Sequence, residues 1–240
     1  MTETRTKKWV DRLKWFASEF IVVVAGILVA FSINTWWQDV ETSRREKEYL
    51  QDLALDFEEN RYRLQEAIKT ADDVVDAAQI LLSFETAEQG KTLGVDSLNE
   101  LVGTLSYLPT FDAVTRTYDN ILGAGELRVL SNADLRMSLA DFESQLRLVG
   151  TVEQTQERQY VSIYEPYILE NLDYLAIASY SSEKVQTPAP THAGAILEVL
   201  GTRKFRNWVV VRLAWADDLR TVHTVVLDLV KEIEGALSEN

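Results

Sequence analysis

The chain has 240 residues, and its 38 acidic side chains outnumber its 24 basic ones, which gives a net charge of −14. A protein that binds nucleic acid needs clustered Lys and Arg to replace phosphate counterions, so this balance argues against that class. The sequence has no cysteine and only two histidines, which excludes thiol catalysis and argues against zinc fingers and iron–sulfur clusters.

The first predicted element is a membrane segment. Residues 20–31 are all apolar or small, and the 23 residues of 15–37 contain only five polar side chains. As a helix this segment would be about 34 Å long, against about 30 Å for the hydrocarbon core of a bilayer. Tryptophan prefers the membrane interface, and four of the six tryptophans bracket the segment: Trp9, Trp15, Trp36 and Trp37. We therefore expect 15–37 to cross the lipid bilayer.

A buried core helix and a cleaved signal peptide are the alternatives. A signal peptide needs small residues at its cleavage site, and residues 32–37 are polar and bulky instead. The sequence therefore favours an uncleaved signal anchor.

The flanking charges predict the topology. Residues 1–16 hold five Lys or Arg side chains, whereas the sixteen residues after Trp37 hold three. Because Lys and Arg are retained on the cytoplasmic side, we expect a cytoplasmic N-terminus. The predicted organisation is a cytoplasmic basic tail (1–14), a transmembrane helix (15–37), a helical stalk (38–48) and an extracytoplasmic helical bundle (49–240).

Small residues in the membrane segment suggest a helix-packing face. Gly26 and Ala30 lie four residues apart, and Asn34 lies one turn further on. Such spacing lets another helix approach closely, and an asparagine can hydrogen-bond across the contact. Glycine and alanine are also simply common in membrane helices, so both interpretations stay open. Glu19 is expected near the interface, where it reaches headgroup water or pairs with a basic residue of a partner helix.

A continuous helix is predicted from Asp39 to about Phe84, because apolar residues alternate steps of three and four. Residues 39–47 lack this stripe and are expected to be a solvated stalk. The stripe consists of Leu50, Leu53, Phe57, Asn60, Leu64, Ala67, Ala71, Val74, Ala78 and Leu81.

Shorter elements are predicted next. A loop covers 86–94 and a helix covers 96–107. Another helix is expected to begin after Thr110 as its N-cap and to end at Gly123, with Gly125 in the turn that follows.

Two further long helices carry the same rhythm. One is expected to begin at Ser131 and to be kinked or ended by Pro166. Its stripe consists of Leu135, Leu139, Phe142, Leu146, Val149, Glu153, Gln156, Tyr160, Ile163 and Tyr167. A loop at 180–193 precedes the last helix, which begins near Thr202. The stripe of that helix consists of Phe205, Trp208, Arg212, Trp215, Leu219, Val222, Val226, Leu229, Ile233 and Ala236. Three matched amphipathic helices predict an all-α, up-and-down bundle.

Polar residues interrupt each stripe: Asn60 in the first, Glu153 with Gln156 in the second, and Arg212 in the third. If the helices align, these side chains are predicted to form one buried polar layer that fixes the register of the bundle. The alternative is that each side chain lies at the edge of the bundle, in water.

The sequence carries no recognisable catalytic, cofactor or metal motif. It lacks a nucleophile elbow and a phosphate-binding glycine loop, and neither histidine follows a glutamate at the spacing of a di-iron bundle. His223 is expected at the margin of the apolar face and His192 in a solvated loop. The acid pairs 72–73 and 217–218 point in different directions on a helix, so they are interpreted as solvated faces. We therefore predict that the protein is not an enzyme and holds no cofactor.

Two stretches resemble a bacterial single-pass inner-membrane family of unknown function. In the first, the resembling residues are Glu19, Gly26, Ala30, Asn34, Trp36, Tyr49, Leu50, Leu53 and Asp56. In the second they are Thr115, Tyr118, Gly125, Leu127, Ser131, Asn132, Leu135 and Leu139. The resemblance covers about a third of the chain and implies an anchored helical domain, but it does not indicate any activity. The doubled Trp36–Trp37 and the proline-rich loop at 186–191 depart from the family pattern.

Two functions fit these observations. The first is a non-catalytic accessory or scaffold subunit of a larger membrane complex, whether respiratory, photosynthetic, transport or secretory, with other subunits or a second copy as its partner. Residues 20–240 carry 35 acidic and 19 basic side chains, a net charge of −16, so a partner attracted by charge would be basic. The second is an extracytoplasmic ligand sensor that signals through a partner.

Overall fold

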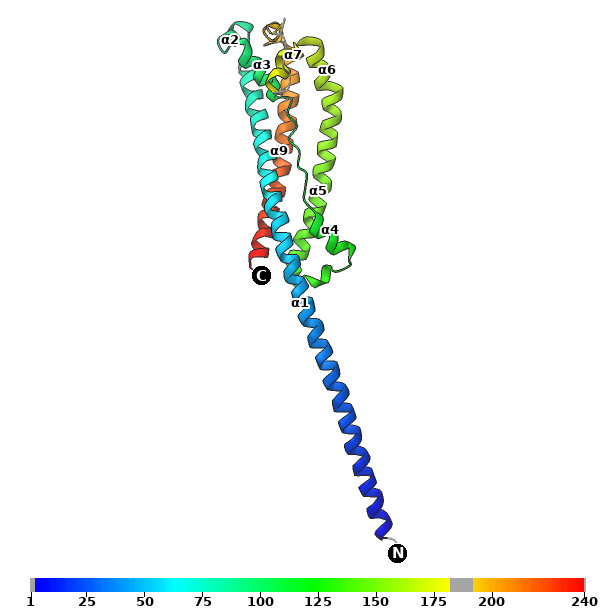
Figure 1. Cartoon of the computed structure of the whole chain (residues 1–240). Helices are drawn as coiled ribbons and strands as arrows, with labels where there is room; N and C mark the ends of the chain where they lie inside the picture. The colour runs from blue at the N-terminus through cyan, green and yellow to red at the C-terminus, as the bar shows by residue number, and fades with distance from the viewer. Residues whose placement is uncertain (1–2, 182–191, 240) are drawn as a thin grey trace.

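The computed structural model describes residues 3–181 and 192–239, with side chains from 19 to 178 and from 192 to 239. In these ranges the chain is all-α, as predicted. One helix, α1 (Glu3–Ser83), runs without a break over 81 residues, about 120 Å at the rise of an α-helix. Its N-terminal half projects alone, and its C-terminal half belongs to the bundle (Figure 1).

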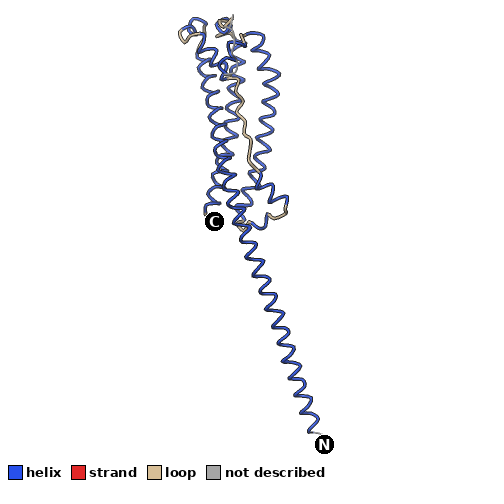
Figure 2. The backbone as a smooth tube through the Cα atoms, in the orientation of Figure 1, coloured by secondary structure: helices blue, strands red, loops and turns tan. Residues whose placement is uncertain are grey.

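The bundle has three long helices and one extended limb. Helix α9 (Arg203–Ser238) packs against both α1 and α5 (Ala133–Gln159). Chain direction alternates up and down: α1 rises, residues 105–115 descend without helix, α5 rises and α9 descends (Figure 1). We call residues 105–115 the strap. It follows the length of the bundle as an extended connection (Figure 2).

Short helices close the two ends. Four of them gather at the end far from the N-terminus: α2 (Ala87–Lys91), α3 (Val95–Thr104), α7 (Tyr174–Ser181) and α8 (Ala195–Val199). Helix α4 (Arg116–Gly123) and the 3-10 turn η1 (Leu127–Val129) lie at the end where α1 enters the bundle (Figure 1). The helices α2 and α8 were not predicted, because each has only five residues and no room for periodicity.

The structure corrects three predicted boundaries. Thr110 does not cap a helix, because it lies in the strap and α4 begins only at Arg116. The helix predicted at 96–107 ends at Thr104. The N-cap of α5 is Asn132 rather than Ser131: the Asn132 side chain accepts hydrogen bonds from the backbone N–H of Asp134 and Leu135. The prediction of Thr202 as the start of the last helix is confirmed, since its hydroxyl accepts from Phe205 N.

The predicted stripe of α1 is confirmed, with every member from Leu53 to Leu81 buried. The predicted stripe of α5 is wrong at one position: Ile163 is half exposed, and Tyr164 is buried instead. The cause is a π-helical turn, η2 (Tyr160–Tyr164), which adds one residue to the turn and leads into α6 (Glu165–Asn171). Pro166 stands in the first turn of α6, directly after the π-turn. In α9 the stripe also drifts, so that His223 and Val230 are buried in place of Val222 and Leu229.

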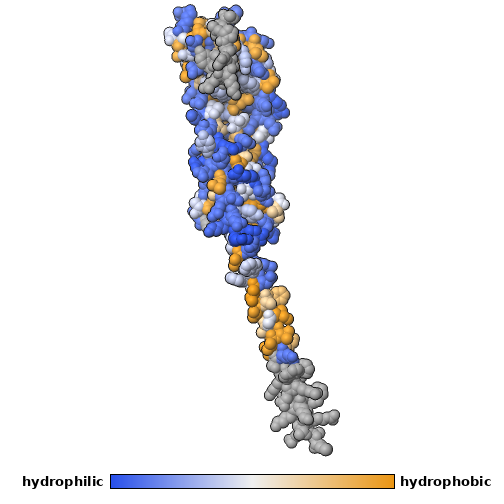
Figure 3. Space-filling model, in the orientation of Figure 1, coloured by the Kyte–Doolittle hydropathy of each residue, from blue (hydrophilic) through white to orange (hydrophobic). Residues whose placement is uncertain are grey.

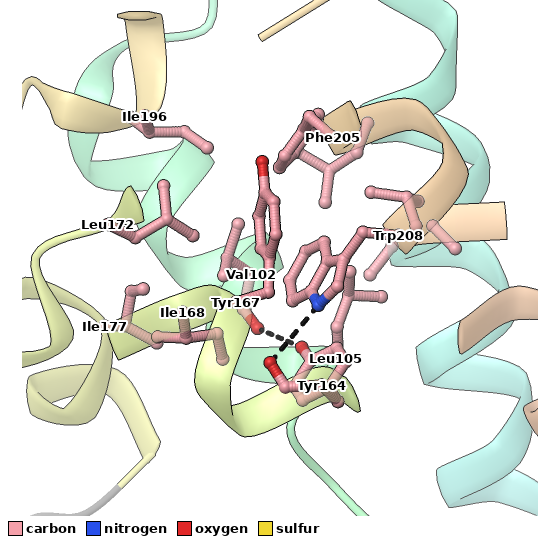
Figure 4. Packing of buried hydrophobic residues seen from close by; sticks show 14 of the residues in the cluster. Val102, Leu105, Tyr164, Tyr167, Ile168, Leu172, Ile177, Ile196, Phe205 and Trp208 are labelled. Atoms are coloured by element: carbon pink, nitrogen blue, oxygen red, sulfur yellow. Dashed lines mark hydrogen bonds between the residues drawn. The ribbon is translucent and has the colours of Figure 1, made fainter. Parts of the chain in front are cut away.

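Two hydrophobic clusters fill the bundle. The cluster near the projecting helix joins α1, α5 and α9 through residues such as Phe57, Phe142 and Val226. The distal cluster is built around Trp208, whose ring stacks on Tyr164 at 4.4 Å and on Tyr167 at 4.9 Å (Figure 4). The indole N–H donates to Tyr164 O, and the Tyr164 hydroxyl donates to Val102 O, so both buried polar groups are satisfied (Figure 4).

Candidate functional site: the exposed apolar helix and the polar residues of the bundle

The projecting half of α1 exposes an apolar surface. Most large apolar side chains from Phe20 to Trp37 are exposed by half or more, and they form an apolar band in the space-filling view (Figure 3). Among the described residues, one helix is long and apolar enough to cross a membrane, and this band belongs to it. The polar Ser32 lies within this band, and its hydroxyl is satisfied by a hydrogen bond that it donates to Leu28 O at 2.8 Å.

The predicted packing residues lie within this band. Gly26, Ala30 and Asn34 are exposed, and a side chain built on Gly26 would meet no atom within 4 Å. The rings of Trp36 and Trp37 meet edge to face at 6.5 Å at one end of the band. Trp9 and Trp15 belong to α1, but their side chains lie outside the described residues.

The last turns of the predicted stalk contact the base of the bundle. A Schellman turn ends α4: Gly125 N–H donates to Leu122 O and Glu126 N–H donates to Ile121 O, with Gly125 at φ +69°. This turn places Glu126 against α1. One Glu126 oxygen accepts from Arg45 and the other from the Tyr49 hydroxyl, each at 2.5 Å.

Two further details support this junction. Glu46 accepts from Ser131 N at 2.5 Å, which joins α1 to the start of α5. The hydrogen bond with Glu126 raises the pKa of Tyr49, because it favours the protonated phenol. The projecting half of α1 and the bundle are therefore connected by side-chain contacts as well as by one continuous backbone.

The predicted polar residues mainly hold the strap. An extended segment inside a helical bundle has main-chain groups without partners, and buried groups of this kind must be hydrogen-bonded. Asn60 is fully buried and binds both polar groups of Val114, accepting from N at 2.7 Å and donating to O at 2.9 Å. Glu153 accepts from Phe111 N at 2.8 Å.

Arg212 performs the same role at the other end of the strap. Its Nε donates to Leu105 O at 2.7 Å and its Nη2 donates to Tyr107 O. The guanidinium is completely buried, and this desolvation lowers the pKa of Arg212. Gln156 is buried too, but it donates to Trp215 O of α9 at 2.8 Å instead of binding the strap.

The prediction of one shared polar layer is therefore corrected. Among the described residues, no hydrogen bond joins Asn60, Glu153, Gln156 and Arg212 to one another, and Arg212 does not pair with Glu153. Their partners are main-chain groups, and Glu153 also contacts the His223 side chain. The alternative of side chains in water at the bundle edge is wrong for Asn60, Gln156 and Arg212, which are buried.

Asp56 was not singled out as a site residue. Its carboxylate, almost fully buried, accepts from Thr117 N at 3.0 Å and pairs with Arg116 at 2.7 Å. Thr117 is in the first turn of α4, so Asp56 stabilises a helix N-terminus from a neighbouring helix. The sequence signals were its place among the residues of the family resemblance and its position directly before the stripe residue Phe57.

His223 was expected at the margin of the apolar face and is instead completely buried. Its Nε2 lies 3.1 Å from Glu153 Oε1, and its Nδ1 has no partner. His192 is exposed. Asp72 and Asp217 share Arg220 as an ion-pair partner, so they belong to a surface ion network. The described residues include no cluster of three acidic or histidine side chains that could hold a metal ion.

Comparisons with known proteins add no relative: no family model, curated protein or solved structure matches the chain.

Proposed function

We propose that this protein is a membrane-anchored, non-catalytic accessory subunit of a larger membrane protein complex. The observation that carries the proposal is the exposed apolar band from Phe20 to Trp37, in a chain that buries its other apolar stripes. A contiguous apolar surface of this length is unfavourable in water and favourable in a bilayer.

The proposed location is the inner membrane of a bacterium, with a cytoplasmic N-terminus and a periplasmic bundle. The excess of Lys and Arg before the apolar segment supports this orientation. The resemblance of the membrane and α4–α5 segments to a bacterial inner-membrane family supports the compartment. A reporter fused after Asn240 that is active only in the periplasm tests the orientation, and activity only in the cytoplasm would reverse it.

The proposed contacts with the partner are of two kinds. In the membrane, the face with Gly26, Ala30 and Asn34 permits close approach of another helix. Outside the membrane, the acidic surface of the bundle attracts a basic partner. A rigid connection between the two surfaces supports a subunit that holds a partner at a fixed position.

Purification from native membranes in a mild detergent, with identification of co-purifying subunits, tests this function. We expect a stable complex with the wild type and its loss with Gly26→Leu/Ala30→Leu, because the larger side chains separate the helices. Ile21→Leu/Val24→Leu is the matched control, since it alters the opposite face of the helix. A monodisperse monomer from wild-type membranes would contradict the proposal, as would equal loss in both variants.

A further inference from the structure

The outer face of α1 in the bundle lies on the same side of the helix as Gly26 and Ala30. The helix is unbroken over its 81 residues, and each residue turns it by about 100°. From Gly26 to Leu55 this amounts to about eight full turns and 20°, and from Gly26 to Tyr62 to about ten full turns. A partner that runs along α1 from Gly26 would therefore also face Leu55 and Tyr62, about 44 Å and about 54 Å further along the axis.

Two large apolar side chains are exposed on this outer face. Leu55 is 61% exposed and Tyr62 is 60% exposed, although the core stripe of α1 from Leu53 to Leu81 is buried. Beside Tyr62 a groove of about 350 Å³ separates α1 from the strap, with Glu66 on one wall and Pro109 on the other. The outer face therefore offers apolar contact area next to a groove that a side chain of a partner can enter.

The charges around Tyr62 favour a basic partner. Glu58 and Glu66 are exposed and lie four residues before and after Tyr62, so the three side chains share one face. Within the described part of the chain, neither carboxylate has an ion-pair partner. Arg63, which also lines the groove, is already paired with two other carboxylates. These two glutamates are therefore available to Lys or Arg side chains of another protein.

The same charges argue against a second copy of this chain as the occupant. In a parallel pair joined along this face, Glu58 and Glu66 of each copy would lie against their counterparts, and like charges in contact are unfavourable. A different protein that carries basic side chains at this level has attraction in place of that repulsion.

We propose that the partner which contacts Gly26 continues out of the membrane as a basic amphipathic helix along the outer face of α1. Its apolar side chains contact Leu55 and Tyr62, and its Lys or Arg side chains pair with the carboxylates on either side of Tyr62. To reach Tyr62 this helix extends about 25 residues, or about 38 Å, beyond the level of Trp37. The inference rests on the proposed accessory role and specifies the kind of partner that this role requires.

Site-specific photo-crosslinking in native membranes tests the proposal. Benzoylphenylalanine is placed in the full-length chain at Leu55, Tyr62, Ile33 or Met137, all of which are exposed. Ile33 lies in the apolar band on the side of Gly26, whereas Met137 lies on α5. We expect Ile33, Leu55 and Tyr62 to crosslink to one other protein, and Met137 not to. Mass spectrometry of the peptide joined to Tyr62 should identify a segment rich in Lys and Arg that follows the membrane helix of that protein.

The outcomes separate this inference from the accessory role. A protein that crosslinks only at Ile33, or only at Leu55 and Tyr62, would overturn the inference and leave the accessory role standing. Crosslinks between two copies of this chain at Leu55, an acidic peptide at Tyr62, or an equal yield at Met137 would also overturn the inference. Crosslinks to no other protein at any of these positions would contradict both proposals.

Charge reversal gives the matched comparison. Glu58→Lys/Glu66→Lys should lower the crosslinking yield at Leu55 about three- to ten-fold, because attraction to basic side chains becomes repulsion. Asp141→Lys/Glu157→Lys makes the same change of charge at exposed positions of α5 and should leave that yield unchanged. Equal effects of the two variants would show non-specific charge attraction and overturn the docking face.

Discussion

Arg212 is a cationic side chain in the core whose hydrogen-bond partners are main-chain carbonyls. Among the described residues, no carboxylate lies within ion-pair distance of it. Leu105 O and Tyr107 O lie just beyond the C-terminal end of α3, where carbonyl groups lack intrahelical donors. The Arg212 guanidinium therefore donates hydrogen bonds to carbonyl groups at the end of α3 and at the start of the strap. This role accounts for a charged side chain on the apolar stripe of α9.

Replacing Arg212 by Met should lower the free energy of unfolding by about 1–3 kcal/mol, because two buried carbonyls lose their donor. Urea unfolding followed by circular dichroism measures the change. Arg220→Met is the control, since Arg220 pairs with Asp72 and Asp217 at the surface, and its loss should cost less than about 1 kcal/mol. Equal destabilisation by the two variants would contradict the assigned role.

The tyrosines around Trp208 predict alkaline instability. Burial raises the pKa of Tyr167 to about 12 and also raises the pKa of Tyr164, because the phenolate would lose its hydration. Stability from the neutral phenols is complete below about pH 10, the unfolded pKa, and is lost as the pH rises through the folded value. We therefore expect the free energy of unfolding to fall between about pH 10 and pH 12.

Tyrosinate absorbance together with circular dichroism over that pH range measures this loss. Tyr164→Phe/Tyr167→Phe should reduce the slope of stability against pH, whereas Tyr62→Phe, at an exposed position on α1, should leave it unchanged. An unaltered slope in the double variant would show that these two phenols do not cause the alkaline unfolding.

At the scale of elements, the π-helical turn η2 and the strap account for most differences between the predicted and the observed bundle. The extra residue in η2 moves Ile163 to the surface and Tyr164 into the core, where it stacks on Trp208. The strap takes the place of the end of one predicted helix and the start of the next, and Asn60, Glu153 and Arg212 supply hydrogen bonds that helical geometry would otherwise provide.

A single-residue deletion tests the role of the π-turn. Deleting the exposed Ser162 should convert η2 to α-helix and keep the registers on both sides, so the variant should still unfold cooperatively. Deleting the exposed Ser144 within α5 should rotate every later residue of that helix by about 100° and expose core side chains. Thermal unfolding compares the two variants. Equal destabilisation would mean that the π-turn itself is required for packing.

Side-chain periodicity was sufficient to predict the three long helices, because apolar steps of three and four extend over many turns from Leu53 to Leu81 and from Phe205 to Ile233. The stripe positions of Asn60, Gln156 and Arg212 were compatible with burial or with the bundle edge, and the structure shows that all three are buried. Their partners could not be predicted, because these are main-chain groups of the strap and of α9, which a hydropathy pattern does not report. The groove beside Tyr62 was also invisible to the sequence, since it arises from the strap packing against α1.

At the scale of the whole molecule, the apolar segment and the bundle are parts of one helix. α1 continues through the stalk without proline, and Glu126 and Ser131 hold its residues 45–49 against the base of the bundle. We therefore expect little bending where the projecting half of α1 meets the bundle.

Loss of the Glu126 contacts should increase bending at this junction. The chain has no cysteine, so spin labels can be introduced at Gln38→Cys and Met137→Cys, both exposed positions. Glu126→Ala should broaden the distance distribution measured by pulsed electron resonance, with a stability loss below about 1 kcal/mol because the contact is partly exposed. Glu88→Ala, which removes a surface pair at the far end of the bundle, should not broaden it. An unchanged width in Glu126→Ala would show that the helix backbone alone sets the stiffness.

The unbroken α1 also fixes an angle about its own axis. Each residue added to the stalk would turn the bundle by about 100° relative to the face of Gly26 and Ala30 and lift it by about 1.5 Å. A partner that contacts both surfaces would therefore reject one or two inserted alanines. Seven would return the azimuth to within about 20° but lift the bundle by about 10 Å, so they separate the effect of the angle from that of the height. In this molecule the number of residues between the face of Gly26 and Ala30 and the bundle specifies an orientation, whereas a flexible linker of the same length would specify only a maximum separation.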